Sequence, residues 1–516
     1  MPTRPSLRAL VRPALLLSLA AAAGCNTNLP PPTPDLPQVT VNVNEPNTVA
    51  PSLKLTVSVS GCDQVKSLTL HDREDLLKTV TYTTNPTPVE LAMNEVRYTR
   101  GIAANLSLTA RVTCTDGRTN TSQAQAAKFF PVAEVIEPPT VDTQVVTDYF
   151  VAEGSGTGAV FIGCAQDAVG RSRMYRVTRA NPQNTVSVDM PIPCSPATTI
   201  TERTATGQRW VWTPRRGAFL MDSNLNITAT RRETTMLQLF VAPDGDALIF
   251  TPTGYMRISR TTGNNLWPEP PVWNFFPDLI AAPVFRNGNT VAIPVQESNT
   301  EGGHDIWVGV LDWTKGQWSS FHLIDTTPTI PPVALDPTGM SLYVATLIPN
   351  NGGAFIRKCA ADSTVDGGRC LNSTNRLWTS VDLAGQMALL LPVSGGSRLA
   401  AIGAGHLWFL DASTGRVLNK DNMALSPEGA LVARIVLPAP NNVFYQFNAA
   451  YPTDSQPLPP PQELIATDGP EKGELYRYQV PGTSVSGALD DSGTLWLRVG
   501  RKLVKTLSPS QYRQVR

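Results

Sequence analysis

The sequence predicts an all-β protein in which a β-sandwich is followed by a β-propeller. Two observations support this fold class. Between residues 53 and 114, short segments alternate strictly between apolar and polar side chains, which is typical of strands with one buried face. From Gly254 onward, glycine-led segments with aromatic residues recur about every 50 residues, and such a period indicates propeller blades.

The first 24 residues predict a secretory signal peptide. Arg4, Arg8 and Arg12 precede a short apolar run that cannot span a bilayer, and small residues lead up to Cys25. This arrangement resembles the lipobox of bacterial lipoproteins, which implies that the signal is removed and Cys25 carries fatty acyl chains such as palmitate. An ordinary cleaved signal that leaves Cys25 unmodified is the alternative.

The cysteine count agrees with a lipidated Cys25. The chain has seven cysteines, so six remain once Cys25 is acylated. Six cysteines in an exported chain can pair completely, in any of fifteen connectivities. Their order along the chain suggests sequential disulfides: Cys62 with Cys114, Cys164 with Cys194, and Cys359 with Cys370.

Proline-rich segments divide the chain into domains. Residues 25–37 contain the lipidated cysteine and a proline-rich tether that cannot form a core. Residues 38–135 form the predicted sandwich, and residues 136–140 a short linker. Several alternating strands within about 100 residues suggest an immunoglobulin-like sandwich. No tryptophan precedes Trp210, so the likeness is one of architecture alone.

Residues 141–516 form the predicted propeller. Glycine-led strands start at Gly254, Gly303, Gly353 and Gly405, at spacings of 49, 50 and 52 residues. At about 40–50 residues a blade, this region accommodates seven or eight blades. The last blade, around Leu495–Leu507, is short, so we expect the strand Gln144–Val151 to complete it and close the ring.

Two short motifs resemble those of known propellers. Residues 407–418, with Asp411 and a Thr-Gly turn, resemble the repeat of pyrroloquinoline-quinone-type (PQQ-like) propellers, a motif that shapes a hairpin and by itself implies no quinone. Residues 491–496 resemble half of the Asp-box of sialidase-like propellers, and we interpret them as a hairpin brace.

Candidate chemistry is sparse along the chain. His304 and His406 both follow a glycine at the same repeat position, which makes them weak candidates for a metal site. No adjacent cysteines, Asp-rich calcium loop, GxSxG, HExxH or P-loop is visible, so no catalytic residues and no cofactor are predicted. Two insertions, Cys359–Cys370 and Tyr451–Gln462, are candidate recognition loops or simple decoration.

Composition excludes nucleic acid as a partner and favours an exported binding protein. Lys plus Arg and Asp plus Glu both number 42, so no net field attracts a polyanion. The leading hypothesis is a lipid-anchored cell-envelope protein whose non-catalytic propeller binds or scaffolds an envelope protein or glycan. The alternatives are an extracytoplasmic enzyme acting on glycans or small alcohols, and a surface adhesion or structural lipoprotein. Asn26 favours the outer membrane under the lipoprotein sorting rule of enteric bacteria.

Overall fold

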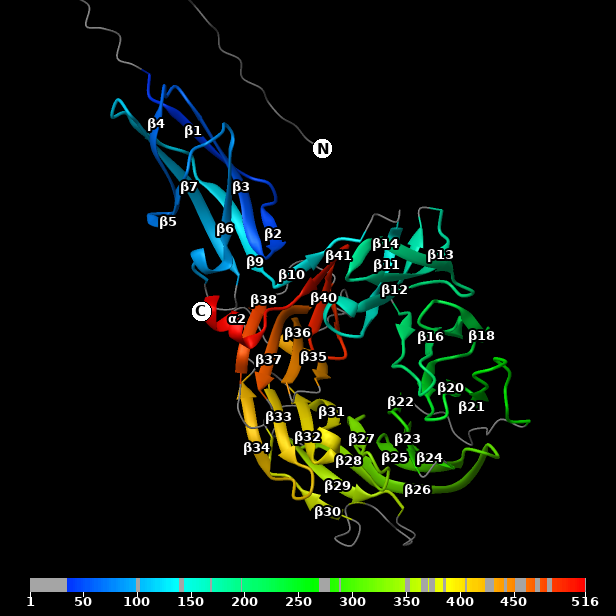
Figure 1. Ribbon diagram of the computed structural model, residues 1–516. Coiled ribbons are helices and arrows are strands. Elements are labelled where there is room, and N and C mark those ends of the chain that lie inside the picture. The colour runs from blue at the N-terminus through cyan, green and yellow to red at the C-terminus, as the bar shows by residue number, and fades with distance from the viewer. Residues whose placement is uncertain are drawn as a thin grey trace, which may run out of the picture.

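The computed structural model describes residues 35–515 except for several internal segments (Figure 1). The segments outside the described residues are 99–102, 139–142, 168, 196, 269–278, 287–288, 349–352, 363–369, 371–375, 384–386, 404–405, 423–430, 440–442, 451–460, 469–473 and 480–484. Cys25 and the predicted signal peptide also lie outside the described residues. Within the described part of the chain, no helix has the length and hydrophobicity needed to cross a membrane.

Residues 38–131 form two β-sheets that share one core. The first sheet has the order β1 (Gln38–Val43), β3 (Ser52–Ser60) and β6 (Thr87–Ala92). The second has the order β2 (Asn47–Ala50), β9 (Gln125–Pro131), β7 (Ala104–Cys114), β4 (Val65–Asp72) and β5 (Asp75–Val80), with β8 (Thr119–Thr121) paired to β7. A 3-10 turn, η1 (Met93–Glu95), follows β6.

The alternating patterns in the sequence correspond to the buried faces of this sandwich. The apolar residues of both patterned segments are buried in the common core, as predicted: Leu53, Leu55, Val57, Val59, Leu106, Leu108, Ala110 and Val112. Since successive side chains of a strand point to opposite faces, the polar residues between them lie outward. The period-2 pattern therefore identified both the strands and the face that each one buries.

The remaining sheets form a β-propeller around a central opening (Figure 1). The described residues contain eight such sheets. In strand order, the first three are β11 (Thr143–Glu153), β12 (Val160–Asp167), β13 (Ser172–Thr178) and β14 (Asn181–Asp189); β15 (Thr199–Ile200), β16 (Arg209–Thr213), β17 (Gly217–Met221) and β18 (Ile227–Arg231); and β19 (Gln238–Val241), β20 (Ala247–Thr251) and β21 (Gly254–Ile258). The ring also contains two 3-10 turns, η2 (Gly156–Gly158) and η3 (Ser394–Gly396).

The next five sheets complete the ring. In the fourth, β22 (Leu279–Ile280) and β23 (Val284–Arg286) both pair with β24 (Thr290–Ser298), followed by β25 (His304–Asp312) and β26 (Gln317–Thr327). The next three are β27 (Val333–Leu335), β28 (Ser341–Leu347), β29 (Ala354–Ala360) and β30 (Arg376–Thr379); β31 (Met387–Val393), β32 (Arg398–Gly403), β33 (His406–Asp411) and β34 (Val417–Asn422); and β35 (Leu431–Pro438), β36 (Val443–Ala450), β37 (Pro461–Asp468) and β38 (Glu474–Gln479). The last is β39 (Val485–Leu489), β40 (Leu495–Val499), β41 (Lys502–Lys505) and β10 (Glu134–Ile136).

A strand from ahead of the propeller completes the last sheet. It is β10, which pairs antiparallel with β41, and its Ile136 is buried there although the sequence assigned it to the linker. The prediction that Gln144–Val151 plays this part is wrong, because these residues lie in β11, which pairs with β12 and begins the first sheet. The segment that leaves the sandwich forms the short strand β10, which pairs with β41 and so occupies the outer edge of the last sheet.

Contacts between the first and last sheets hold the ring together at this seam. The Gly154 amide donates to Asp491 Oδ2 (2.8 Å), and the Asp491 amide donates back to the Gly154 carbonyl (3.0 Å). Phe161 packs edge-on against Trp496, with ring centroids 4.6 Å apart. The interpretation of residues 491–496 as a hairpin brace needs one change, because Asp490 Oδ1 accepts the turn amides of Ser492 and Thr494 while Asp491 spans the seam.

The three predicted disulfide pairings are confirmed. Cys62–Cys114, Cys164–Cys194 and Cys359–Cys370 have Cα–Cα distances of 5.7, 6.0 and 5.6 Å. These separations are within the range that a disulfide requires. The Cys370 amide also donates to the Ile324 carbonyl of β26 (2.6 Å), so this disulfide fixes the end of its loop against the preceding sheet.

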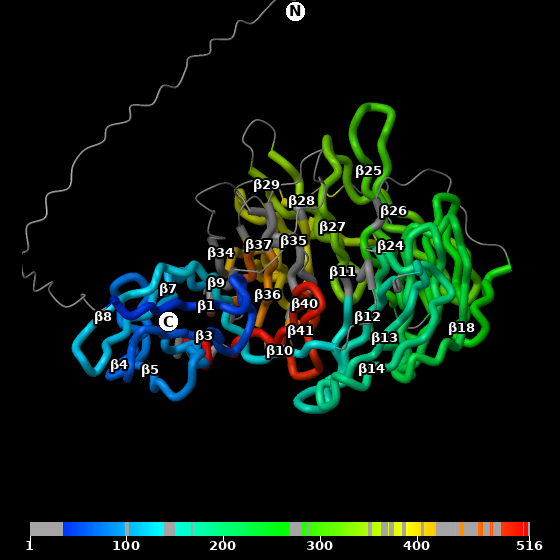
Figure 2. Tube along the Cα trace, turned by 90° about the horizontal axis from the view of Figure 1, so that it is seen from above, coloured from blue at the N-terminus to red at the C-terminus, as the bar shows by residue number. Residues whose placement is uncertain are grey.

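The sandwich and the propeller are joined by a shared apolar core. Val49, Phe130 and Val132 from the sandwich side pack with propeller residues that include Phe447 and Leu495. The short C-terminal helix α2 (Pro509–Val515) lies at this junction, where Tyr512 packs against the same core. Figures 1 and 2 both show the sandwich extending from the rim of the ring, so that it covers neither face of the propeller.

Candidate functional site

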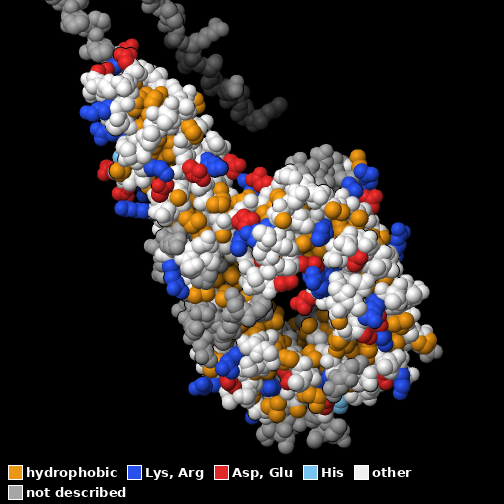
Figure 3. Space-filling model, viewed as in Figure 1, with side chains coloured by type: hydrophobic (Ala, Val, Ile, Leu, Met, Phe, Trp, Pro, Cys, Tyr) orange, Lys and Arg blue, Asp and Glu red, His pale blue; other side chains and the backbone are white. Residues whose placement is uncertain are grey.

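The central opening of the ring is bordered by the first strand of each sheet. Figure 1 places β27, β31 and β35 on this inner side. Described side chains on such strands that remain partly exposed are largely apolar, among them Phe240, Ala334, Leu389 and Leu391. Figure 3 shows hydrophobic side chains gathered around a hollow at the centre of the ring, with charged side chains at part of its border. This wall offers apolar contact to whatever enters it.

A buried carboxylate at the end of β11 is held by two arginines. Glu153 Oε1 accepts from Arg209 Nε and Glu153 Oε2 from Arg203, so the acid links the first propeller sheet to the second. Burial alone raises the pKa of Glu153, but the hydrogen bonds and charges of Arg209 and Arg203 outweigh it and hold the pKa below its ordinary value. Glu153 therefore stays ionised and acts as a structural anion.

The two candidate histidines lie at equivalent positions but not close together. His304 begins β25 and His406 begins β33, each the third strand from the inner side of its sheet, as the repeat alignment predicted. The sheet β27–β30 lies between their two sheets in the order of the ring. His304 Nδ1 lies 3.5 Å from Ser298 Oγ, and the side chain of His406 lies outside the described residues. The described residues contain no group of three metal-ligating side chains.

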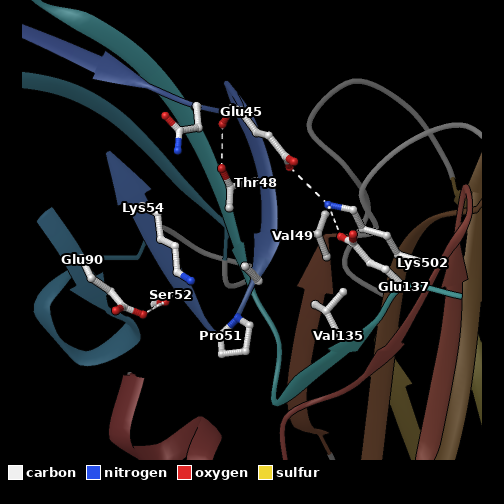
Figure 4. A pocket seen from close by; sticks show the side chains of 12 residues that line it. Glu45, Thr48, Val49, Pro51, Ser52, Lys54, Glu90, Val135, Glu137 and Lys502 are labelled. Carbon is white, nitrogen blue, oxygen red and sulfur yellow. Dashed lines mark hydrogen bonds and ion pairs between the residues drawn. The ribbon is translucent and has the colours of Figure 1, made fainter. Parts of the chain in front are cut away.

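A cleft of about 390 Å³ opens between the sandwich and the last propeller sheet (Figure 4). Its walls come from β2, β3 and β6 of the sandwich and from β10 and β41 of the propeller. Figure 4 shows the Lys502 side chain reaching toward Glu45 and Glu137, and its ammonium lies 3.2 Å from a carboxylate oxygen of each. Lys502 thereby ties the propeller to the sandwich and to the segment that connects them.

The electrostatics of the cleft keep this tie ionised. Burial lowers the pKa of Lys502, whereas hydrogen bonds to Glu137 and Glu45 raise it, and the net result lies above the ordinary lysine value. On the sandwich wall of the cleft, Ser52 Oγ of β3 donates to Glu90 of the neighbouring strand β6. The cleft thus combines a satisfied ionic tie with a mixed polar and apolar lining.

Sequence reasoning did not identify these charged groups. Glu45, Glu137 and Lys502 are far apart in the chain and belong to no motif, so only the fold brings them together. The same holds for Glu153 and its arginines, which are 50 and 56 residues apart. The two insertions singled out from the sequence are mostly outside the described residues, although Cys359 lies in β29 and β37 begins at Pro461 within the second insertion.

The fold and these sites define a β-propeller protein with an attached β-sandwich. No model of a known protein family matches the chain, and no curated protein matches its sequence. Among solved structures, it is similar to the Dos1 propeller, at 9% identity over 73% of this chain and 94% of that one, with a TM-score of 0.48. It is also similar to BamB from Moraxella catarrhalis, at 12% identity over 73% of this chain and 100% of that one, with a TM-score of 0.41.

A third similar structure is the Cps50 (Swd1) β-propeller domain of Myceliophteria thermophila. The identity is 9% over 62% of this chain and 99% of that one, with a TM-score of 0.42. Because all three TM-scores lie below 0.5, the propeller assignment rests on the sheet order and the ring arrangement of this chain itself.

Proposed function

We propose that this chain is an exported lipoprotein, anchored through Cys25, whose non-catalytic propeller binds or scaffolds a protein of the cell envelope. In this proposal the sandwich is immunoglobulin-like, the eight described sheets are eight blades, and the anchor lies in the outer membrane. The supporting observation is the rigid junction between sandwich and propeller. Because the sandwich is fixed to the propeller, it acts as an arm that sets the position of the disc-shaped propeller and its binding faces relative to the membrane.

Three independent contacts make this junction rigid. β10 adds its edge to β41, the shared core contains Phe130 and Phe447, and Lys502 bridges two carboxylates. Only residues 132–133 separate β9 of the sandwich from β10 of the last propeller sheet, which is too short a connection to let the domains swing freely. The sandwich acts as an arm: β7, with eleven residues, spans about 36 Å at about 3.3 Å per residue.

The N-terminal segment enters the sandwich at the end of this arm away from the ring (Figure 1). There Arg118 donates to the Asp35 carbonyl and Asn120 donates to the Pro37 carbonyl, both at 2.6 Å. A lipid on Cys25 would then hold the tip of the sandwich near the membrane and the disc beyond it. Because the arm leaves from the rim, both faces of the disc and the central opening remain accessible to partners.

The anchor is tested by intact-mass analysis and membrane fractionation of the full chain. We expect the wild-type protein to start at Cys25, carry acyl chains and sediment with outer membranes, whereas Cys25→Ala is released into the soluble fraction. A mature wild-type chain with an unmodified Cys25 contradicts the anchor. Glu74→Ala serves as a control, because Glu74 is an exposed sandwich residue far from the signal.

The binding role is tested by site-specific photocrosslinking in cells. The crosslinking residue replaces Leu389, which borders the central opening, or Leu76, an exposed residue of the sandwich, as a control. We expect Leu389 to form a discrete adduct with an envelope protein and Leu76 to form none. A scaffold propeller is contradicted if only the sandwich position forms adducts. It is also contradicted if neither position, nor any other residue on the ring, forms one.

A further inference from the structure

One face of the second propeller sheet carries a cluster of four arginines. We call the face that contains the β16–β17 turn and the connections between sheets the connection face, and the opposite one the turn face. Arg215 and Arg216 lie in the β16–β17 turn, and Arg231 and Arg232 lie at the end of β18. The two segments touch, because a Cβ on Gly217 would lie 2.3 Å from the Arg231 carbonyl and 3.0 Å from the Arg232 Cα.

Three of these arginines are exposed and uncompensated. Arg215, Arg216 and Arg232 are exposed, and they take no part in any described ion pair. Arg231 pairs with Glu233 (3.0 Å), whose carboxylate also accepts from the Thr235 hydroxyl (2.6 Å). Burial raises the pKa of Glu233, but its bonds to Thr235 and Arg231 lower it overall, so the acid stays ionised and is fully engaged. Four arginines and one glutamate leave a local charge of +3 on a chain whose net charge is zero.

Arg215 adopts a left-handed backbone conformation in the β16–β17 turn. Pro214 and Arg215 are the central residues of a tight turn closed by the Arg216 amide on the Thr213 carbonyl (3.1 Å). Arg215 has φ +58°, in the left-handed region that favours glycine or asparagine at this turn position. An arginine there costs about 1 kcal/mol relative to glycine. Arg73, Leu225 and Ser394 also have a positive φ, so the argument for a role of Arg215 rests on its place in the basic cluster.

We propose that this arginine cluster binds a carboxylate-rich segment of a protein partner, an inference that rests on the proposed binding function of the propeller. Guanidinium groups bind carboxylates through paired N–H donors, which gives geometric specificity as well as charge. Arg215, Arg216 and Arg232 supply three such groups on two adjacent segments that Gly217 holds close together. An extended acidic peptide can contact all three in succession.

The position of the cluster favours a protein over the membrane. Figure 1 places β16 and β18 on a side of the ring away from the sandwich, and the N-terminal segment enters at the far tip of that sandwich. A membrane that holds the tip of the arm is therefore remote from the cluster. The net charge of the chain is zero, and salt screens exposed charges beyond about a Debye length. The cluster therefore attracts a partner only at short range, which suits contact with a short acidic segment.

The test uses a fluorescein-labelled octaglutamate peptide and the folded mature chain in fluorescence anisotropy at low salt. We expect the double variant Arg216→Ala, Arg232→Ala to weaken peptide binding about tenfold, which corresponds to loss of about 1.4 kcal/mol. The matched control is Arg416→Ala, an exposed arginine in the β33–β34 turn on the turn face, which should leave the affinity unchanged. Equal affinity of the double variant and the wild type overturns the proposal.

A second variant separates recognition from folding. Arg215→Gly relieves the left-handed strain, so its unfolding midpoint should be unchanged or higher while peptide binding falls severalfold. Arg73→Gly is the control, because Arg73 is also exposed and has φ +55°, but lies in the β4–β5 turn of the sandwich. It should match Arg215→Gly in stability and the wild type in binding. Arg215→Gly with wild-type binding contradicts a role for this guanidinium.

Two further outcomes identify a different occupant or a different failure. Binding to phosphatidylglycerol vesicles but not to the peptide overturns the protein partner in favour of a lipid surface. If photocrosslinking at Leu389 captures an envelope protein equally well in the wild type and the double variant, the scaffold function stands and the arginine cluster is not its site. If the peptide binds but no ring position yields an adduct, the scaffold function fails instead.

Discussion

Removing a glycine from the contact between two neighbouring propeller sheets should destabilise the whole ring. In the β33–β34 turn, Asp411 Oδ1 accepts the amides of Ser413 and Thr414, both at 3.0 Å, and Gly415 follows with φ +72°. The Trp378 indole of the preceding sheet donates to the Ala412 carbonyl of this turn (3.1 Å). A Cβ at position 415 would lie 2.4 Å from the Trp378 ring, so Gly415→Ala cannot keep that contact.

The size of the effect follows from three contributions. Alanine at a positive φ costs about 1 kcal/mol, displacing a packed ring costs about 2 kcal/mol, and losing the indole hydrogen bond costs about 1 kcal/mol. The expected loss is therefore about 4 kcal/mol in the free energy of unfolding, a large part of the usual total. Gly500→Ala is the matched control, because Gly500 has φ +59° and no atom within 4 Å of its Cβ position, so only the first contribution applies.

Urea denaturation followed by tryptophan fluorescence measures this difference. All ten tryptophans lie at or after Trp210, so the signal reports the propeller and not the sandwich. In a Trp378→Ala background the indole side chain is absent, so Gly415→Ala should lower the free energy of unfolding by only about 1 kcal/mol. The difference between the two backgrounds measures the coupling of Gly415 to Trp378 in a double-mutant cycle. Equal destabilisation by Gly415→Ala and Gly500→Ala, or the same cost with and without Trp378, refutes the packing argument.

The remaining predictions concern the seam, a buried ion pair and a disulfide. Asp491→Ala removes the acceptor of the Gly154 amide and should lower the free energy of unfolding of the propeller by about 1–2 kcal/mol. The control Glu74→Ala on the sandwich should not change the same tryptophan fluorescence transition. An unchanged transition in Asp491→Ala would contradict a role of Asp491 at the seam. Glu153→Gln should destabilise by about 3 kcal/mol at pH 7. Because the folded-state pKa of Glu153 is lowered, its contribution is present above the ordinary glutamate pKa and is lost as pH falls through the folded value, so acidification should destabilise the wild type more steeply than Glu153→Gln. Parallel pH curves would show that Glu153 contributes nothing through its charge. Replacing Cys62 and Cys114 by serine opens a 52-residue loop and should lower sandwich stability by about 4 kcal/mol in circular dichroism melts, with the tryptophan-reported transition moving less.

Local patterns in the sequence predicted much of the fold because the physics behind them is local. Alternation at Leu53–Val59 predicts a buried face whatever the strand pairs with, and the Asp411 turn predicts a hairpin from its own side chains. Cysteine pairing was predictable because close sequential pairs suit an oxidised chain. The closing strand was not predictable in this way, since β10 and β11 both have β-forming sequences and only the geometry of the last sheet selects β10.

The charged sites could not be predicted because their members are not adjacent in the sequence. Lys502 meets Glu45 only after the sandwich and the last propeller sheet have docked, and neither residue stands out by its local context. His304 and His406 show the reverse case, because a repeat position gives them equivalent places in two sheets but not proximity. Periodicity in a propeller therefore predicts structure within a blade, while contacts between blades and domains depend on the closed arrangement.

The seam explains why the sandwich and the propeller act as one body. The first and last sheets of the ring meet here, and the chain passes from β10 of the last sheet directly into β11 of the first. In this chain β10 fills the outer edge of the last sheet, and its Glu134 pairs with Arg179 of the first sheet, whose guanidinium also lies 5.6 Å from the Trp496 ring. The strand that closes the ring is thus the same strand that leaves the sandwich. Pulling on the arm must therefore load the seam, so a force applied at the sandwich tip should open the ring between the first and last sheets before it unfolds any other pair.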